Sequence, residues 1–135
     1  MIAYYIDSSA AMKFLVPEKE SKELQKLATM TGATFVSSAL IDIEITRNVR
    51  KLYPKGAKAA LAFLETIQKI DISNDIVRSA AQLLPQSKLR SLDAIHLATF
   101  KKLSDGFVGM ITYDAVLVKS AQELGLNVFA PGAAI

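Results

Sequence analysis

The stretch Tyr4-Tyr5-Ile6-Asp7-Ser8-Ser9 decides the expected fold, because an apolar run ends there at a carboxylate. Met1 to Ile6 is almost continuously apolar, which is typical of a strand buried on both faces of a parallel sheet. Apolar residues dominate after Ser9, so we expect a helix that runs to Val16, before Pro17. Asp7 is therefore predicted to lie at the carboxyl end of a strand, where open α/β sheets hold their ligands.

Predicted strands and helices alternate along the rest of the chain. Apolar runs predict further strands at residues 34–37, 69–72, 107–112 and 127–129. Apolar residues at helical spacing predict helices at residues 18–30, 39–52, 56–67, 74–84, 92–102 and 114–124. This alternation predicts an α/β fold with a central parallel sheet of four to five strands and helices on both faces.

Local signals add detail to these elements. Ser73 and Ser91 are predicted to cap helices at their N-termini, and Gly32 is predicted to close one. The apolar stripes of the helices at 39–52 and 56–67 include Leu52 and Leu61, which are predicted to pack in the core.

The composition fits one domain spanning residues 1–135. Hydrophobic residues make up 51% of the chain, sufficient for a sizeable core. The mean hydropathy is +0.28 although 21% of the residues are charged, so we expect another copy or another chain to cover some apolar surface. The apolar runs are too short to span a bilayer and no signal peptide is visible, so no membrane association is expected.

Charge and cysteine content narrow the classes of function. The chain has 16 Lys and Arg against 13 Asp and Glu, a net charge of +3 that is compatible with a polyanionic ligand. It has no cysteine, which excludes disulfides and thiolate metal sites and favours a reducing, cytoplasmic location.

Three carboxylates occupy comparable places in the predicted elements. Asp7 and Asp114 each follow an apolar strand and open a helix, and Asp93 lies in the first turn of another helix. Taken singly, each is explained by helix capping or by the helix dipole. Together they predict a cluster of like charges at one edge of the sheet, which is costly unless a cation neutralises it. All-oxygen ligands favour a hard ion, Mg²⁺ or Mn²⁺, rather than zinc.

A fourth carboxylate is expected from the helix at 39–52, which offers Asp42 and Glu44. Both lie on the flanks of the stripe formed by Ile41, Ile45 and Val49, so helical phase does not choose between them.

The chain resembles a known family in four short blocks that occur in the family's order. These blocks are Tyr5-Ile6-Asp7-Ser8-Ser9-Ala10 with Lys13, Ser38-Ala39-Leu40 with Glu44, Leu92-Asp93-Ala94-Ile95-His96-Leu97-Ala98, and Thr112-Tyr113-Asp114 with Ala121 and Leu124-Gly125-Leu126. In this respect the chain looks like a PIN-domain ribonuclease of the VapC toxin type, and the resemblance covers nearly the whole length.

The resemblance implies a PIN-like fold and an Mg²⁺- or Mn²⁺-dependent endoribonuclease. It implies that Asp7, Glu44, Asp93 and Asp114 are both the catalytic residues and the metal ligands, with Glu44 chosen over Asp42. It further implies a homodimer that is held inactive by a cognate antitoxin protein. In such a site the metal ion activates a water for attack on the phosphorus. Asp114 is expected to ligate directly, to ligate through water, or to position the nucleophile.

Other polar residues near these blocks have two readings each. Ser9 and Thr112 are expected to support the carboxylates or the metal waters, or else to cap locally. His96, the single histidine, is read as a general base or as a packed residue, and the apolar neighbours favour packing. Lys13, Arg47, Arg50 and Lys51 are candidates for RNA phosphate contacts, with a solvated basic face as the alternative.

Two other functions compete with an RNA-cleaving enzyme. One is a catalytically silent PIN-like module that binds RNA or protein. The other is a signalling receiver domain, which requires an acidic pair after its first strand and a lysine after its last. Here Asp7 stands alone and Phe129 leads to Ala130 and Pro131, so the receiver domain is disfavoured.

Overall fold

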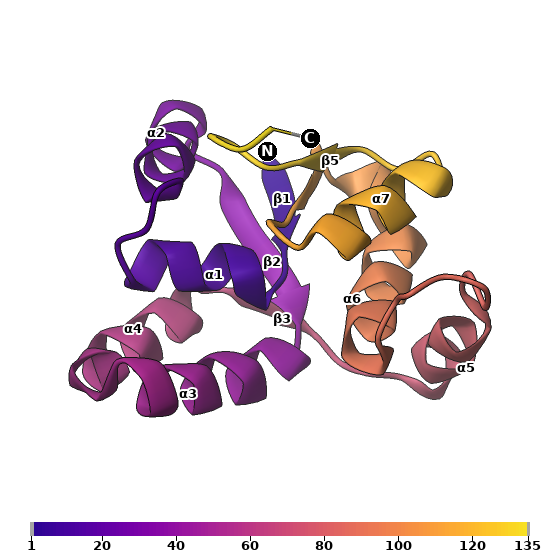
Figure 1. Cartoon of the computed structure of the whole chain (residues 1–135), viewed down its shortest axis with the longest axis horizontal. Coiled ribbons are helices and arrows are strands. Elements are labelled where there is room, and N and C mark those ends of the chain that lie inside the picture. Colours follow the sequence, from indigo (N-terminus) through magenta and orange to yellow (C-terminus); the bar gives the residue numbers. More distant parts are fainter. Residues whose placement is uncertain (1, 135) are drawn as a thin grey trace.

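The computed structural model describes residues 2–134 and is built on a parallel five-stranded sheet (Figure 1). The strands are β1 (Ala3–Ile6), β2 (Thr34–Ser38), β3 (Gln68–Ile70), β4 (Gly109–Ile111) and β5 (Val128–Phe129). Their spatial order is β3-β2-β1-β4-β5, and every neighbouring pair is parallel. The predicted α/β fold with a central parallel sheet is confirmed.

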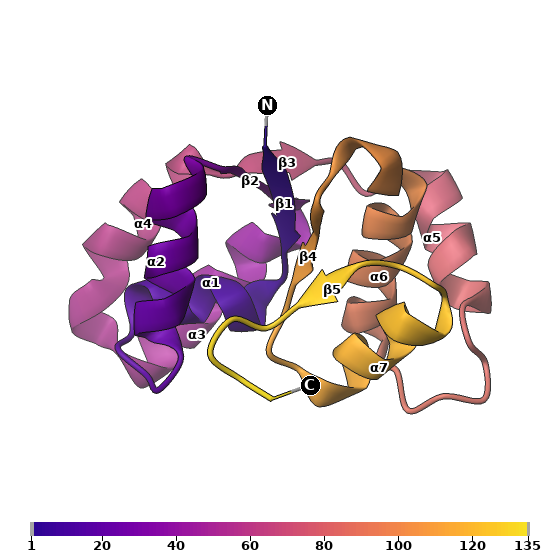
Figure 2. The same ribbon diagram turned by 90° about the horizontal axis from the view of Figure 1, so that it is seen from above.

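Helices cover both faces of this sheet. They are α1 (Ser8–Leu15), α2 (Ser21–Thr31), α3 (Leu40–Leu52), α4 (Ala57–Thr66), α5 (Asn74–Gln82), α6 (Ser91–Lys102) and α7 (Ala115–Glu123), with short 3-10 turns at Pro54–Gly56 and Ser104–Gly106. Helices α1 to α4 lie on one side of the sheet and α5 to α7 on the other (Figure 2). No helix within residues 2–134 is long and apolar enough to cross a membrane.

Strand β1 supplies side chains to both halves of the core. Tyr4 and Ile6 pack with apolar residues of α1 to α4. Tyr5 points to the opposite face and packs with Leu97 of α6 and Leu117 of α7. This alternation explains why the first strand has no polar residue before Asp7, because successive side chains of a central strand face opposite helical layers.

The order of the strands creates a switch point between β1 and β4. The chain leaves β1 toward β2 and β3 and then returns to add β4 on the other side of β1, with Ile6 paired to Ile111. The two connections that leave the carboxyl ends of β1 and β4 therefore part in opposite directions. Open α/β sheets bind ligands in the crevice that forms at such a point.

Two predicted helix starts differ from the structure. Helix α2 begins at Ser21 rather than Glu18, because the backbone N–H of Glu18 donates to the Ser21 hydroxyl and forms a turn before the helix. Ser91 is the first residue of α6 and not its cap, since the cap position is Arg90 and no side chain accepts a hydrogen bond there. Ser73 and Gly32 do cap their helices as predicted.

Two leucines expected in the core are exposed instead. Leu52 is 68% exposed because it lies at the last turn of α3, where the chain turns away through Tyr53. Leu61 is 59% exposed because α4 buries only a narrow side that carries Ala60 and Leu64. The apolar stripe of each helix is thus wider than the part of the helix surface that is buried against the rest of the protein.

Candidate active site

Asp7 follows β1 and is buried, and both oxygens of its carboxylate accept hydrogen bonds. Its Oδ1 accepts hydrogen bonds from the backbone N–H of Ala10 (3.1 Å) and from the Ser9 hydroxyl (2.7 Å). Its Oδ2 accepts one from the Thr112 hydroxyl, 2.7 Å away, across the switch point. Burial raises the pKa of Asp7, and these hydrogen bonds oppose the rise. Asp7 therefore caps α1 and also presents a carboxylate to the crevice.

Ser9 and Thr112 join the end of β1 to the start of α7. The Ser9 hydroxyl accepts a hydrogen bond from the Tyr113 N–H (2.9 Å), and the Thr112 hydroxyl accepts one from the Asp114 N–H (3.2 Å). Asp114 in turn caps α7 by accepting from the Leu117 N–H at 2.9 Å. The hydroxyls predicted to support the carboxylates thus lie between Asp7 and Asp114.

The structure distinguishes Glu44 from Asp42, which helical phase left open. The Glu44 side chain is only 13% exposed, and its Oε1 lies 2.6 Å from Nε2 of His96. Its Oε2 accepts a hydrogen bond of 3.3 Å from the Ser8 hydroxyl, at the N-terminus of α1. The Asp42 side chain is 51% exposed and pairs with Lys69 at 3.2 Å. Glu44 is therefore the residue of α3 that joins the carboxyl edge of the sheet.

His96 is buried and lies between Glu44 and Tyr5. Its Nδ1 is 2.7 Å from the Tyr5 hydroxyl, which accepts a hydrogen bond from the Ser38 N–H at 3.1 Å. Burial raises the pKa of Tyr5 above its usual range, so the phenol keeps its proton and can donate it to Nδ1. When the phenol donates to Nδ1, the ring proton on Nε2 is donated to Oε1 of Glu44.

This chain of hydrogen bonds fits the packed reading of His96 and adds a role for Tyr5 that sequence reasoning missed. The sequence pattern places Tyr5 only within a buried strand. The available signal was weak: a hydroxyl-bearing aromatic residue two positions before a carboxylate, in a strand that is otherwise apolar.

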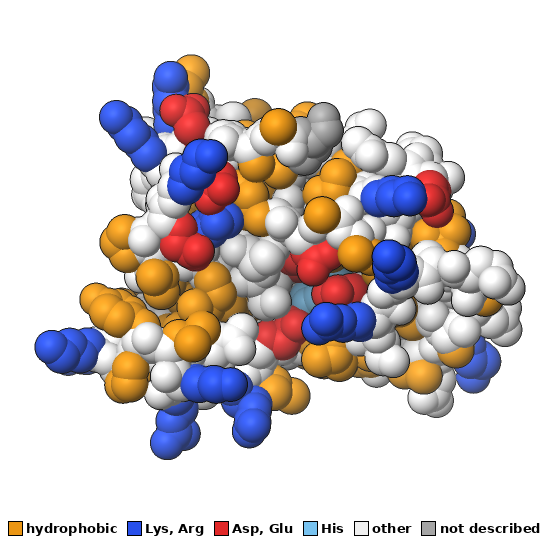
Figure 3. Space-filling view, viewed as in Figure 1, with side chains coloured by type: hydrophobic (Ala, Val, Ile, Leu, Met, Phe, Trp, Pro, Cys, Tyr) orange, Lys and Arg blue, Asp and Glu red, His pale blue; other side chains and the backbone are white. Residues whose placement is uncertain are grey.

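Asp93 shows most directly that the carboxylates share one space. Its pKa is raised to about 6, chiefly by burial and then by the negative charges of Asp114 and Asp7. Glu44 adds to the rise, and His96 opposes it. Asp and Glu side chains gather around the single histidine at the centre of the face in Figure 3. The four carboxylates predicted from sequence are brought together.

The donor set fits a hard divalent cation. The groups that converge are carboxylates and hydroxyls, which offer only oxygen, and they repel one another when ionised. Within residues 2–134, no three His, Asp or Glu side chains stand in an arrangement that could already hold one ion together. A site of this kind suits an ion that keeps several of its waters and contacts few carboxylates directly.

The predicted phosphate-binding residues differ in availability. Lys13 forms an ion pair of 2.7 Å with Glu20 and lies 4.9 Å from the ring centre of Tyr113, so its charge is already engaged. Arg47, Arg50 and Lys51 are exposed on α3 and have no ion-pair partner in the described part of the chain. They are therefore free to meet a phosphate.

Comparison with known proteins identifies the family. The PIN domain model matches residues 4–117. Ribonuclease VapC35 of Mycobacterium tuberculosis is 36% identical over 133 residues, which cover 96% of this chain and 98% of that protein. Ribonuclease VapC46 of the same species is 37% identical over 131 residues, covering 97% and 99%. The fold and site define a PIN domain. The chain belongs to the PIN-domain family, in its VapC branch.

Solved structures show the same fold at lower identity. The crystal structure of VapC20 from Mycobacterium tuberculosis, a sarcin-ricin loop cleaving toxin, superposes with a TM-score of 0.74 at 16% identity and covers 95% of this chain and 99% of that one. A toxin-antitoxin complex from Klebsiella pneumoniae gives a TM-score of 0.71 at 21% identity, with 98% and 99% covered.

Proposed function

We propose that this protein is an Mg²⁺- or Mn²⁺-dependent endoribonuclease. The observation that carries the proposal is the convergence of Asp7, Glu44, Asp93 and Asp114 at the switch point, close enough for their charges to raise the pKa of Asp93. Like charges in one crevice are costly, so such a cluster indicates a cation as the missing partner. The family supports this reading, because the relatives with the same architecture are named ribonucleases.

Two groups of residues form the site: carboxylates that would bind the ion, and polar residues that orient those carboxylates. Asp7, Glu44, Asp93 and Asp114 would hold the divalent ion directly or through its waters. When bound, such an ion supplies an activated water and screens negative charge on the phosphate. Ser9 and Thr112 fix both oxygens of Asp7, and the proton on Nε2 of His96 fixes Oε1 of Glu44. The protein's own contribution is therefore a rigid set of oxygens, oriented before the substrate arrives.

The likeness to toxin-antitoxin complexes supports a protein partner. We infer that this chain acts in the cytoplasm as the toxin of such a pair and that an antitoxin covers the crevice. We also infer a homodimer, since apolar side chains such as Ile43, Leu52 and Leu61 stand exposed on α3 and α4. These residues offer apolar surface that a second chain can cover.

The test is cleavage of total cellular RNA by the purified protein freed of any partner. We expect cutting with Mg²⁺ or Mn²⁺, none with EDTA, and none with the Asp93→Asn variant under any condition. Asp105→Asn, an exposed residue of the 3-10 turn at Ser104–Gly106, is the matched control and should cut like the wild type. If RNA stays intact with wild-type protein that still binds metal, the chain is a silent RNA- or protein-binding module instead.

A further inference from the structure

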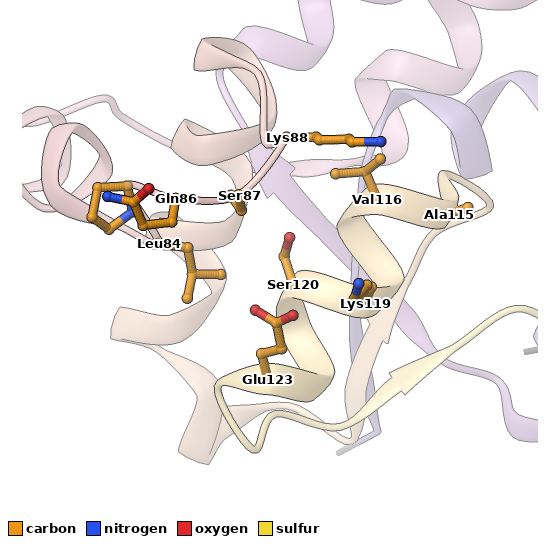
Figure 4. A pocket seen from close by; sticks show the side chains of 10 residues that line it. Leu84, Gln86, Ser87, Lys88, Ala115, Val116, Lys119, Ser120 and Glu123 are labelled. Atoms are coloured by element: carbon orange, nitrogen blue, oxygen red, sulfur yellow. The ribbon is translucent and has the colours of Figure 1, made fainter.

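A pocket outside the carboxylate cluster has no role in the chemistry described above. It has a volume of about 710 Å³ and lies between the loop 84–88, which precedes α6, and the exposed side of α7 (Figure 4). Ala115, which lines it, directly follows Asp114 in the chain. The pocket therefore begins one residue beyond a carboxylate of the site. Pockets of this size accommodate small organic groups.

Ser120 is the buried polar residue in the wall of the pocket. Its side chain is 2% exposed and points toward the loop across the pocket (Figure 4). Among residues 2–134, every fully buried polar side-chain atom has a hydrogen-bond partner. The Ser120 hydroxyl adds a polar group to the wall of the pocket.

The pocket combines apolar walls with polar groups that converge. Leu84 and Val116 provide apolar surface, and the Glu123 carboxylate lies beside Ser120 on the same side of α7. Lys88 and Lys119 stand at the rim, and neither has an ion-pair partner in the part of the chain that the structure describes. The pocket thus offers apolar side chains, a carboxylate, a hydroxyl and two positive charges without ion-pair partners among the described residues.

The loop that forms one wall is held in shape by its own contacts. The Leu84 carbonyl accepts a hydrogen bond of 2.9 Å from the Ser87 N–H, a turn that Pro85 favours. The Ser87 hydroxyl accepts one of 3.2 Å from the Leu89 N–H. Leu84 has a φ of 44°, the one positive value of a non-glycine residue within 2–134. The loop is therefore ordered by its own hydrogen bonds, and Leu84 keeps a backbone conformation that leucine rarely adopts.

We propose that this pocket binds one unpaired guanine base of the RNA, next to the phosphate that the carboxylate site cleaves. The apolar walls take the faces of the base, as single-stranded RNA recognition requires. Lys88 and Lys119 meet the flanking phosphates. This inference rests on the proposed function in so far as the base belongs to an RNA that the protein cuts.

Guanine is selected by its donors. An ionised carboxylate accepts hydrogen bonds and donates none, and it can accept two side by side. The Watson–Crick edge of guanine carries two adjacent donors, N1–H and the N2 amino group, which match Glu123. Uracil has one donor between two acceptors, and adenine and cytosine place an acceptor beside their amino group. The Ser120 hydroxyl is left to donate to O6 of guanine.

A nucleotide titration tests the pocket without any cleavage. Guanosine 5′-monophosphate added to the metal-free protein should shift the amide NMR signals of residues 84–88 and 115–123, and uridine 5′-monophosphate should shift them much less. The Glu123→Gln variant should weaken binding of the guanine nucleotide by about tenfold, because glutamine accepts only one of the two donors. Ser120→Ala should weaken binding of the guanine nucleotide less.

Glu65→Gln, an exposed residue of α4, is the matched control and should bind like the wild type. Equal shifts with both nucleotides, or none in these segments, would overturn the proposal.

A cleavage experiment then places the base relative to the cut. Wild-type protein is given a pool of short single-stranded RNAs with random sequence, and the fragment ends are sequenced. We expect guanine to be enriched at one fixed position beside the cut, and this enrichment to vanish among the fragments that Glu123→Gln produces. Cutting without such enrichment overturns the guanine pocket and leaves the nuclease standing. If wild-type protein cuts nothing, the proposed function fails, and the nucleotide titration alone decides on the pocket.

Discussion

At the scale of single residues, burial and then the negative charges of Asp114 and Asp7 destabilise the ionised form of Asp93. Its pKa rises from 3.8 to about 6 in the folded protein. A raised carboxyl pKa means that the folded state binds the proton more tightly than the unfolded state. The resulting stability is fully present below pH 4 and is lost as the pH rises through 6.

The Asp93→Asn variant should therefore be more stable than the metal-free wild type above pH 6. We expect a gain of about 1–2 kcal/mol at pH 8, after allowance for the partial solvent screening of this side chain, and almost no gain near pH 4. Thermal unfolding in EDTA across this pH range measures the difference, with Asp105→Asn as control. A gain that does not change with pH would contradict the account.

His96 and Tyr5 are expected to act as one unit. Replacing His96 by Ala leaves the Tyr5 hydroxyl and one Glu44 oxygen without their partner and opens a cavity, so it should cost about 2–4 kcal/mol of unfolding free energy. Tyr5→Phe should cost about 1–3 kcal/mol. Because the two share a hydrogen bond, the double variant should lose less than the sum of both. Urea unfolding of the four proteins in a double-mutant cycle tests this, and full additivity would show that the pair is not coupled.

At the scale of elements, the helix starts combine capping with charge, and substitution at Asp114 can separate the two. Asp114→Asn keeps an oxygen that accepts from the Leu117 N–H, so the stability of α7 should be retained while RNA cleavage is lost. Asp114→Ala removes the cap and should cost about 1 kcal/mol in addition. Chemical unfolding and RNA cleavage are measured on both variants. If the Asp114→Asn variant still cleaves RNA, Asp114 caps α7 and has no role in catalysis.

At the scale of the whole molecule, binding of a cation should stabilise the fold. An ion that binds the folded state and not the unfolded chain raises the unfolding free energy by RT ln(1 + c/Kd), where c is the free ion concentration, which is about 2.7 kcal/mol at a hundredfold excess over Kd. We expect Mg²⁺ and Mn²⁺ to raise the Tm of the wild type reversibly, with EDTA restoring it. Asp93→Asn and Glu44→Gln should respond much less, and Glu65→Gln should respond like the wild type. An equal rise in all four proteins would indicate a non-specific salt effect.

Much of the fold was predictable because its signals are local. Apolar runs and helical spacing predicted the parallel sheet, and the strand that ends at Asp7 and the helix that opens at Asp114 stand where expected. The predictions of burial were wrong at Leu52 and Leu61, which are exposed. Residue spacing shows which residues share a helix face, but not how much of that face other elements cover. The start of α2 was misplaced because a single Ser21 hydroxyl set the turn before it.

Local sequence signals were enough to specify the alternation of strands and helices. They also specified the position of three carboxylates just beyond strand ends or within a first helical turn. They did so because backbone conformation and capping depend on neighbouring residues. Residue spacing left Glu44 and Asp42 open, and the family resemblance implied Glu44. The tertiary structure was needed to show that Tyr5 and His96 hold Glu44 and that the loop 84–88 faces α7. These arrangements depend on the order of the strands, which brings together residues far apart in the chain, and no local period encodes that order.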